Sequence, residues 1–264
     1  MSEPTMASRM AATLRPENLN PVMFQEWQDL LFLHWEYNPQ AIQETLPKGL
    51  SVDTFNGRAY IGVLPFVTLG ARPRFLPALP GLSEFPQINF RTYVYDEHSV
   101  PGVWFYSLDA GQRIAAALAR MFFGLPFVYA KMSVEKDAGG EIRFTSQRPD
   151  APAGLHSLFR YRGMGAARRS EPGSLEFFLA ERYVLFSRPS NSSQLRSGRV
   201  HHRSYALLDA EVLEWTEALF SLNGFDPPNR PPDQAAMSLH VNAAIYPLQD
   251  TGKSLAVRVS RLLS

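Results

Sequence analysis

An arginine lies among amide and phenol side chains in residues 87–95 (QINFRTYVY), where polar and apolar residues alternate. Alternation with a period of two is typical of a β-strand. One face of this predicted strand carries Gln87, Asn89, Arg91, Tyr93 and Tyr95. The planar guanidinium of Arg91 suits a carboxylate or phosphate oxygen. This face predicts a ligand site if it lines a small barrel; the alternative is an Arg91 paired with a structural acid such as Asp109 or Glu84.

His34 is a second candidate for chemistry. On a predicted strand within residues 27–37 it shares a face with Glu36. A neutral imidazole beside a carboxylate can move protons near neutral pH, so the pair predicts acid–base chemistry. The alternative is a core histidine whose hydrogen bonds are satisfied. Tyr106 and Tyr129 either add hydroxyls to a pocket or pack in the core.

The common catalytic and cofactor motifs are absent from the sequence. No Gly-x-Gly-x-x-Gly turn follows a predicted strand, and there is no Walker lysine loop, Gly-x-Ser-x-Gly elbow or His-Glu-x-x-His motif. The absence of cysteine excludes disulfides, thiol nucleophiles and Cys-ligated metal sites. The adjacent His201 and His202 would point to opposite faces of a strand, away from a shared metal. We therefore expect no metal and no cofactor.

Composition restricts the class of protein. The 264 residues are 45% hydrophobic and 19% charged, as in a globular protein with a substantial core. A net charge of +1 argues against a nucleic-acid surface. No apolar stretch is long enough to span a membrane, and residues 1–20 contain no apolar signal segment. We expect a cytoplasmic protein with no nucleic-acid partner and no membrane partner.

The elements that must position these residues are mostly predicted strands. They fall within residues 27–37 and at 52–55, 59–69, 87–95, 103–108, 127–134, 141–147, 182–187, 198–207, 238–246 and 255–259. Helices are predicted at 39–46, 110–123, 174–180 and 209–220, with Asn38, Asp109 and Ser174 as N-caps. Residues 149–172 are predicted to be irregular, Asn56-Gly57 predicts a hairpin turn, and the proline-rich connection at 70–86 is long enough to cover a site. This order predicts one mainly β domain over residues 21–264, after a flexible tail at 1–20.

Blocks of sequence along residues 27–246 together resemble a known family. They are DLLFLHW at 29–35, LPKGL at 46–50, NFRTYV at 89–94, GVWFYSLD at 102–109, GSLEFFLAERY at 173–183 and, more loosely, residues 201–207. In this order they resemble the YqjF-like family of uncharacterised bacterial proteins, itself remotely similar to acetoacetate decarboxylase. The resemblance implies an acetoacetate-decarboxylase-like β-barrel with a few short helices, around a small and mostly apolar cavity.

Residues 119–132 resemble the decarboxylase segment that carries its Schiff-base lysine, with the lysine replaced. The decarboxylase pattern is Gly-Arg-Glu, two residues, Gly-x-Pro and a lysine pair. Arg120, Gly124 and Pro126 match this pattern, but Phe127 and Val128 stand where the lysines should be. The resemblance thus implies a preserved frame without the amine nucleophile, which works only with a depressed pKa.

Other residues that accompany this lysine in the decarboxylase, two carboxylates and an arginine, are replaced as well. Gln87 stands in place of a glutamate, Met121 in place of the glutamate after the arginine, and Glu36 near the position of an arginine. Lys131 is a candidate relocated amine. On a regular strand it would lie about 13 Å from Phe127 on the same face. The alternative is a lysine at the strand end with its amine in solvent.

These residues lead to two hypotheses. The first is a small-molecule binding protein for an organic acid, with a ligand site formed by Gln87, Arg91, Tyr93, Arg120 and Tyr129. The alternative is an enzyme of lyase or dehydratase type in the same cavity, with His34 and Glu36 as acid and base or Lys131 as the amine. Whether the chain is an enzyme stays open at this point. The superfamily's tendency to associate leaves a homo-oligomer open as well.

Overall fold

Long antiparallel strands make up most of the structure. The computed structural model describes residues 2–189 and 194–251. Its strands are β1 (Met23–Tyr37), β2 (Leu50–Val52), β3 (Ala59–Pro73), β4 (Phe85–Asp96), β5 (Pro101–Ala110), β6 (Phe127–Tyr129), β7 (Lys131–Lys136), β8 (Ile142–Gln147), β9 (Ser157–Arg168), β10 (Val184–Ser187), β11 (Arg196–His202), β12 (Leu207–Trp215), β13 (Gln234–Ile245) and β14 (Gln249–Asp250). Its helices are α1 (Met6–Thr13), α2 (Pro39–Thr45), α3 (Arg113–Phe123), α4 (Leu175–Ala180) and α5 (Ala218–Leu222).

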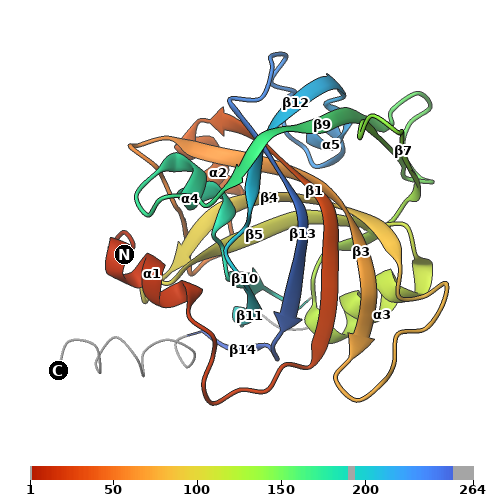
Figure 1. The fold of residues 1–264 in the computed structure, drawn as a ribbon. Helices are drawn as coiled ribbons and strands as arrows, with labels where there is room; N and C mark the ends of the chain where they lie inside the picture. Colours follow the sequence, from red (N-terminus) through yellow and green to blue (C-terminus); the bar gives the residue numbers. More distant parts are fainter. Residues whose placement is uncertain (1, 190–193, 252–264) are drawn as a thin grey trace.

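Seven strands close into a barrel (Figure 1). The order runs β13, β1, β3, β4, β5, β10 and β11, and the ring closes because β11 also pairs with β13. The seam between β5 and β10 is a short parallel pairing at Val103–Leu185 and Trp104–Phe186. Gly102 permits this approach, since a Cβ there would lie 2.7 Å from the carbonyl oxygen of Val184. The prediction of a mainly β barrel with a few short helices is confirmed.

A second layer covers the outer face of β1, β3 and β4. β12, β9, β8 and β7 continue the sheet beyond β13. In Figure 1, β12, β9 and α5 lie at the top and β7 at the upper right. Between the layers is an apolar core that includes Leu31, Trp35, Phe144, Phe159 and Phe220. Ile88 and Phe90 of β4 belong to this outer core. The alternate side chains of β4 therefore face the barrel interior.

A bulge in β1 changes which of its side chains face inward. Asp29 has a φ of 52°, and the register with β3 shifts between Gln28 and Leu33. Trp27 lines the interior before the bulge, and Leu30 lines it afterwards. The side chains of β1 that face the interior are thus odd-numbered before the bulge and even-numbered after it. This change is expected because a bulge inserts one extra residue into the strand.

Helix α1 lies within the segment predicted to be a flexible tail, residues 1–20. Arg9 of this helix donates two hydrogen bonds of 2.7 Å to Asp53, which is fully buried. Arg182, in the turn before β10, binds the same carboxylate at 2.7 Å. The structure differs from the prediction at residues 6–13 because this ion pair fixes α1 to the barrel.

Two predicted elements are wrong because long-range strand pairing decides their conformation. Residues 209–220, predicted as a helix, form most of β12 before α5, and residues 149–172, predicted as irregular, contain β9. β9 and β12 pair with each other, which overrides local propensity.

The Asn56-Gly57 turn forms, with φ of 51° and 78°, but β2 pairs with β4 instead of β3. The predicted strand at 255–259 lies outside the described residues.

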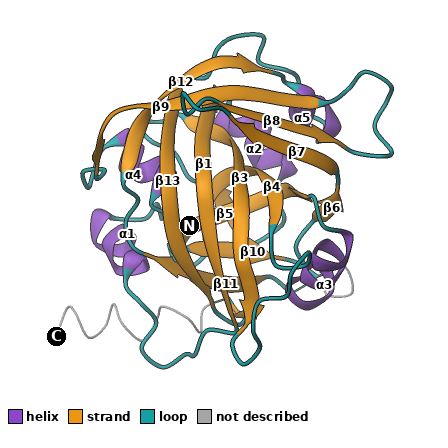
Figure 2. Cartoon of the chain, turned by 45° about the vertical axis from the view of Figure 1, so that its right-hand side comes forward, coloured by secondary structure: helices purple, strands orange, loops and turns teal. Residues whose placement is uncertain are grey.

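The short helices lie around the outside of the strands (Figure 2). Asn38 and Ser174 cap α2 and α4 as predicted. α3 is capped by Gln112 instead of Asp109, because β5 continues to Ala110 and the helix begins only at Arg113. In the described part of the chain, no helix has the length and apolar character needed to cross a membrane.

Candidate functional site

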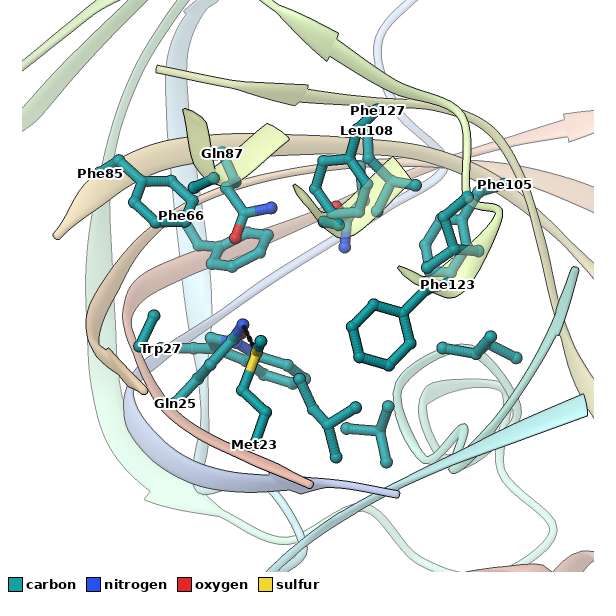
Figure 3. A pocket seen from close by; sticks show the side chains of 18 of the residues that line it. Met23, Gln25, Trp27, Phe66, Phe85, Gln87, Phe105, Leu108, Phe123 and Phe127 are labelled. Atoms are coloured by element: carbon teal, nitrogen blue, oxygen red, sulfur yellow. Dashed lines mark hydrogen bonds between the residues drawn. The ribbon is translucent and has the colours of Figure 1, made fainter. Parts of the chain in front are cut away.

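A cavity of about 500 Å³ lies inside the barrel, and most of its wall is apolar. Figure 3 shows the aromatic rings around it, among them Phe66, Phe85, Phe105, Phe123 and Phe127. These side chains come from β3, β4, β5, α3 and β6. A mostly apolar concave wall with a few polar groups is the usual composition of a small-molecule site.

Three polar side chains of β4 line this cavity: Gln87, Asn89 and Arg91. The Thr68 hydroxyl donates to Oε1 of Gln87, so the amide nitrogen of Gln87 is the group that remains for a ligand. Oδ1 of Asn89 is buried and has no hydrogen-bond partner in the described residues. The alternation seen in the sequence thus places one cation and two amides in a cavity with apolar walls.

The guanidinium of Arg91 is buried without a carboxylate. The residue is 7% exposed. Its Nη2 donates to the carbonyl of Leu179 at 3.2 Å and lies 3.4 Å from the Tyr93 hydroxyl. In the described ranges, its Nε has no hydrogen-bond partner and no acid lies within ion-pair distance. Part of its hydrogen-bonding capacity is therefore unused by the protein.

The predicted alternative for Arg91 was a structural acid. Asp109 instead accepts two hydrogen bonds from Arg148, at 2.8 Å and 2.7 Å. Burial raises the pKa of the Asp109 carboxyl, against the opposing effect of Arg148. Glu84, the second acid considered, is exposed. The structure pairs neither acid with Arg91.

His34 and Tyr93 form a buried chain behind Arg91. His34 Nδ1 lies 2.6 Å from Oε1 of Gln234, and its Nε2 lies 2.5 Å from the Tyr93 hydroxyl. Because the Gln234 oxygen accepts, Nδ1 carries the proton and the Tyr93 hydroxyl donates to Nε2. Burial, with a smaller effect of the Arg91 charge, lowers the pKa of His34 to about 3. His34 is thus a neutral imidazole that orients Tyr93, and neither residue lines the cavity.

Glu36 and Lys131 lie away from the cavity. The Glu36 carboxylate binds Arg58 at 3.1 Å on the surface and does not contact His34. Lys131 is exposed at the start of β7, which pairs with β8 in the outer layer. The sequence analysis placed Lys131 on the same strand face as Phe127. In the structure the strand is interrupted at Ala130, which separates β6 from β7.

Neither of the two ligand residues predicted in residues 120–129, Arg120 and Tyr129, lines the cavity. Phe127 lines the cavity, whereas Arg120 is exposed on α3 and Tyr129 packs against Arg113, 4.3 Å from its guanidinium carbon to the ring centre. Val128 does not line the cavity, and no lysine is present among the described residues that do. The structure therefore brings Gln87 and Arg91 together, with Tyr93 behind them, and leaves Arg120 and Tyr129 outside.

Arg182 is a cavity residue that the sequence analysis missed. It lines the cavity at 8% exposure, and Arg182 and Arg91 lie 5.0 Å and 5.4 Å from the ring centre of Tyr93. Unlike Arg91, it is paired with Asp53. Its signal was its place in the GSLEFFLAERY block, which indicated family membership but not a position in the cavity.

The mouth of the cavity lies between α3 and the connection from β3 to β4. Four apolar side chains there both line the cavity and are exposed: Leu76, Leu79, Leu118 and Phe122. The Gln112 side chain donates to the carbonyl of Gly81 at 3.1 Å, which joins the start of α3 to this connection. Side chains that reach both the cavity and solvent mark the opening through which a ligand would pass.

Sequence comparison identifies relatives of this chain. The family DUF2071, described as an uncharacterized conserved protein, matches residues 24–242. The uncharacterized protein YqjF of Bacillus subtilis (strain 168) is 40% identical over 192 residues, which cover 72% of this chain and 77% of YqjF.

Solved structures with the same fold are much more distant in sequence. The enduracididine biosynthesis enzyme MppR, complexed with the condensation product of pyruvate and imidazole 4-carboxaldehyde, has a TM-score of 0.60 at 11% identity, covering 88% of this chain and 90% of MppR. Acetoacetate decarboxylase from Legionella pneumophila has a TM-score of 0.57 at 10% identity, covering 90% and 91%. The predicted acetoacetate-decarboxylase-like barrel is confirmed.

Proposed function

The chain belongs to the DUF2071 family, and we propose that it binds an organic acid inside its barrel, with the acid's carboxylate on Arg91. One observation carries this proposal. Arg91 is 7% exposed, and no acid of the described residues balances its charge. A buried charge without a partner costs several kcal/mol, and an anionic ligand would offset that cost.

The other polar groups beside Arg91 add hydrogen bonds for an anion. Gln87 and Asn89 are neutral amides, so they add hydrogen bonds without adding charge. Arg182 shares the Asp53 carboxylate with Arg9, so these two arginines together keep one positive charge near the site. Arg91 with two amides complements a carboxylate, which would accept from the unused Nε of Arg91.

The position of Phe127 supports binding without a Schiff base. It lines the cavity where the resemblance to the decarboxylase implies a lysine. The candidates for other chemistry, His34, Glu36 and Lys131, do not line the cavity. MppR, which has the same fold, holds a product formed from pyruvate, but at this sequence distance that is an analogy of fold alone.

Calorimetric titration with organic acids and their methyl esters tests the proposal. We expect acids to bind and matched esters to bind at least about tenfold more weakly, since the ester carries no charge for Arg91. Arg91→Gln should remove this preference. Arg58→Gln, at a surface arginine paired with Glu36, is the control and should keep it. Equal binding of acids and esters by the wild-type protein would refute the proposal.

A further inference from the structure

We infer that the acid bound by this protein has a long apolar body, of about 10 to 16 carbon atoms, that extends from Arg91 toward the mouth of the cavity. The inference rests on the proposed function and specifies its ligand. It follows from three properties of the cavity: where its polar groups lie, how large it is and what forms its mouth.

The free polar groups lie along one strand of the cavity wall. Gln87, Asn89 and Arg91 follow one another along β4. The polar side chains nearer the mouth already have partners within the protein. Oε1 of Gln25 accepts from the Trp27 indole at 3.0 Å, and the Ser83 hydroxyl accepts from a backbone amide at 2.7 Å. A ligand would therefore find polar contacts along β4, a charged contact at Arg91 and apolar contacts elsewhere.

The cavity volume is too large for a small keto acid. An apolar cavity of about 150 Å³ holds one benzene molecule. The volume here, about 500 Å³, is roughly three times larger, which gives room for up to about 20 non-hydrogen atoms. A three- or four-carbon acid on Arg91 would leave most of the aromatic wall without a contact, and such contacts supply most of the binding free energy in an apolar site.

The length of the cavity agrees with its volume. Phe85, next to the mouth connection, and Arg91 both line the cavity and are six residues apart on β4. That separation corresponds to about 20 Å of strand. An extended chain advances about 1.2 Å per bond, since each residue contributes three bonds and about 3.6 Å. A straight chain of about 16 bonds would thus reach from Arg91 to the mouth.

The mouth has the chemistry needed to admit an apolar body. Leu79, Leu118 and Phe122 are 50%, 42% and 69% exposed, and each also lines the cavity. Exposing large apolar side chains is unfavourable in water, and covering them with the end of a ligand would recover part of that free energy. The apolar surface is continuous from the mouth into the cavity.

A chain-length series tests the inference with the full-length protein. Straight-chain acids from butanoic to hexadecanoic acid are titrated by calorimetry below their aggregation limits, together with decanol as a match for decanoic acid. Affinity should rise about threefold to fourfold per methylene until the cavity is filled, and then level off. Decanol should bind more weakly than decanoic acid to the wild-type protein, and Arg91→Gln should remove that difference while keeping the dependence on chain length.

Two alanines of α3 give a matched pair for the apolar body. Ala119 lines the cavity, whereas Ala117 is exposed and does not. Ala119→Phe should lower the chain length at which affinity levels off, and Ala117→Phe should leave it unchanged. Circular dichroism and thermal unfolding of both variants check that each is folded.

The outcomes separate this inference from the proposed function. If butanoic acid binds as tightly as decanoic acid and the binding depends on Arg91, the proposed function stands and the long apolar body is refuted. If the two alanine variants change the chain-length limit equally, the body does not occupy this cavity and the inference fails. If no acid of any length binds, the proposed function itself is refuted.

Discussion

Replacing Arg91 by methionine should stabilise the ligand-free protein and weaken acid binding. Methionine fills similar space with an unbranched apolar chain. The substitution removes a buried charge that costs several kcal/mol, and it loses the hydrogen bond to the Leu179 carbonyl, worth about 1.5 to 3 kcal/mol. The net change in the free energy of unfolding should be a gain of about 1 to 2 kcal/mol. For a chain of this size that gain corresponds to a rise in Tm of about 2 to 4 °C.

Arg182→Met is the matched comparison, because both arginines are buried and both contact the ring of Tyr93. Arg182 is paired with Asp53, which is fully buried. Arg9 remains bound to that carboxylate in the variant. Even so, Asp53 and the Phe178 carbonyl each lose a hydrogen bond from a charged donor, which should lower the free energy of unfolding by about 1 to 3 kcal/mol. The two arginines contact the same tyrosine ring, but replacing them by methionine should change the free energy of unfolding in opposite directions.

Urea unfolding followed by circular dichroism, with and without decanoic acid, measures both effects. The acid should raise the midpoint of the wild-type protein more than that of Arg91→Met, because a ligand with a higher affinity for the folded state stabilises that state more. A loss of more than about 1 kcal/mol in Arg91→Met without ligand would refute the reasoning. Arg91 would then be a structural residue whose charge is satisfied within the protein.

Further predictions concern the residues behind Arg91 and the amine chemistry. Tyr93→Phe should lower the free energy of unfolding by about 1 to 3 kcal/mol, since His34 Nε2 loses its donor; urea unfolding measures this, and an unchanged midpoint would contradict the hydrogen bond. The pKa of His34 is lowered to about 3 when folded, so between pH 6.5 and pH 5 the unfolded chain takes up a proton that the folded chain does not. Stability should fall by about 2 kcal/mol over that interval, and His34→Gln should flatten this dependence; equal slopes in both proteins would count against it. Borohydride treatment with keto acids, followed by intact mass measurement, should give no adduct, and an adduct on Lys131 would favour the amine-based alternative.

The sequence predicted the polar face of β4 but not the direction in which it points. Alternation shows that Gln87 and Arg91 share a face, yet either face of a barrel strand can be buried. The direction is decided by β8, β9 and α5, which cover the opposite face at Ile88 and Phe90. One of these strands, β9, was predicted as irregular, so this layer could not be assembled from the sequence.

The predictions for Lys131 and Asp109 depended on contacts between distant segments. Lys131 was placed by extending one regular strand through residues 127–134, but β6 pairs with β5 and β7 pairs with β8, so the chain changes direction at Ala130. Asp109 seemed available to Arg91 because β5 follows β4. Its partner, Arg148, follows β8 and could not be identified from local spacing.

The short seam between β5 and β10 makes barrel closure the least secure part of the cavity wall. Parallel pairing is slightly weaker per residue than antiparallel pairing, and this seam is brief, so its backbone amides should exchange with solvent sooner than those of β1 or β3. Val103 on one side of the seam and Leu185 on the other both line the cavity. A bound molecule that touches both side chains would hold the two strands together, which should slow hydrogen exchange along β10. Hydrogen exchange along β10 would thus report on ligand binding inside the barrel.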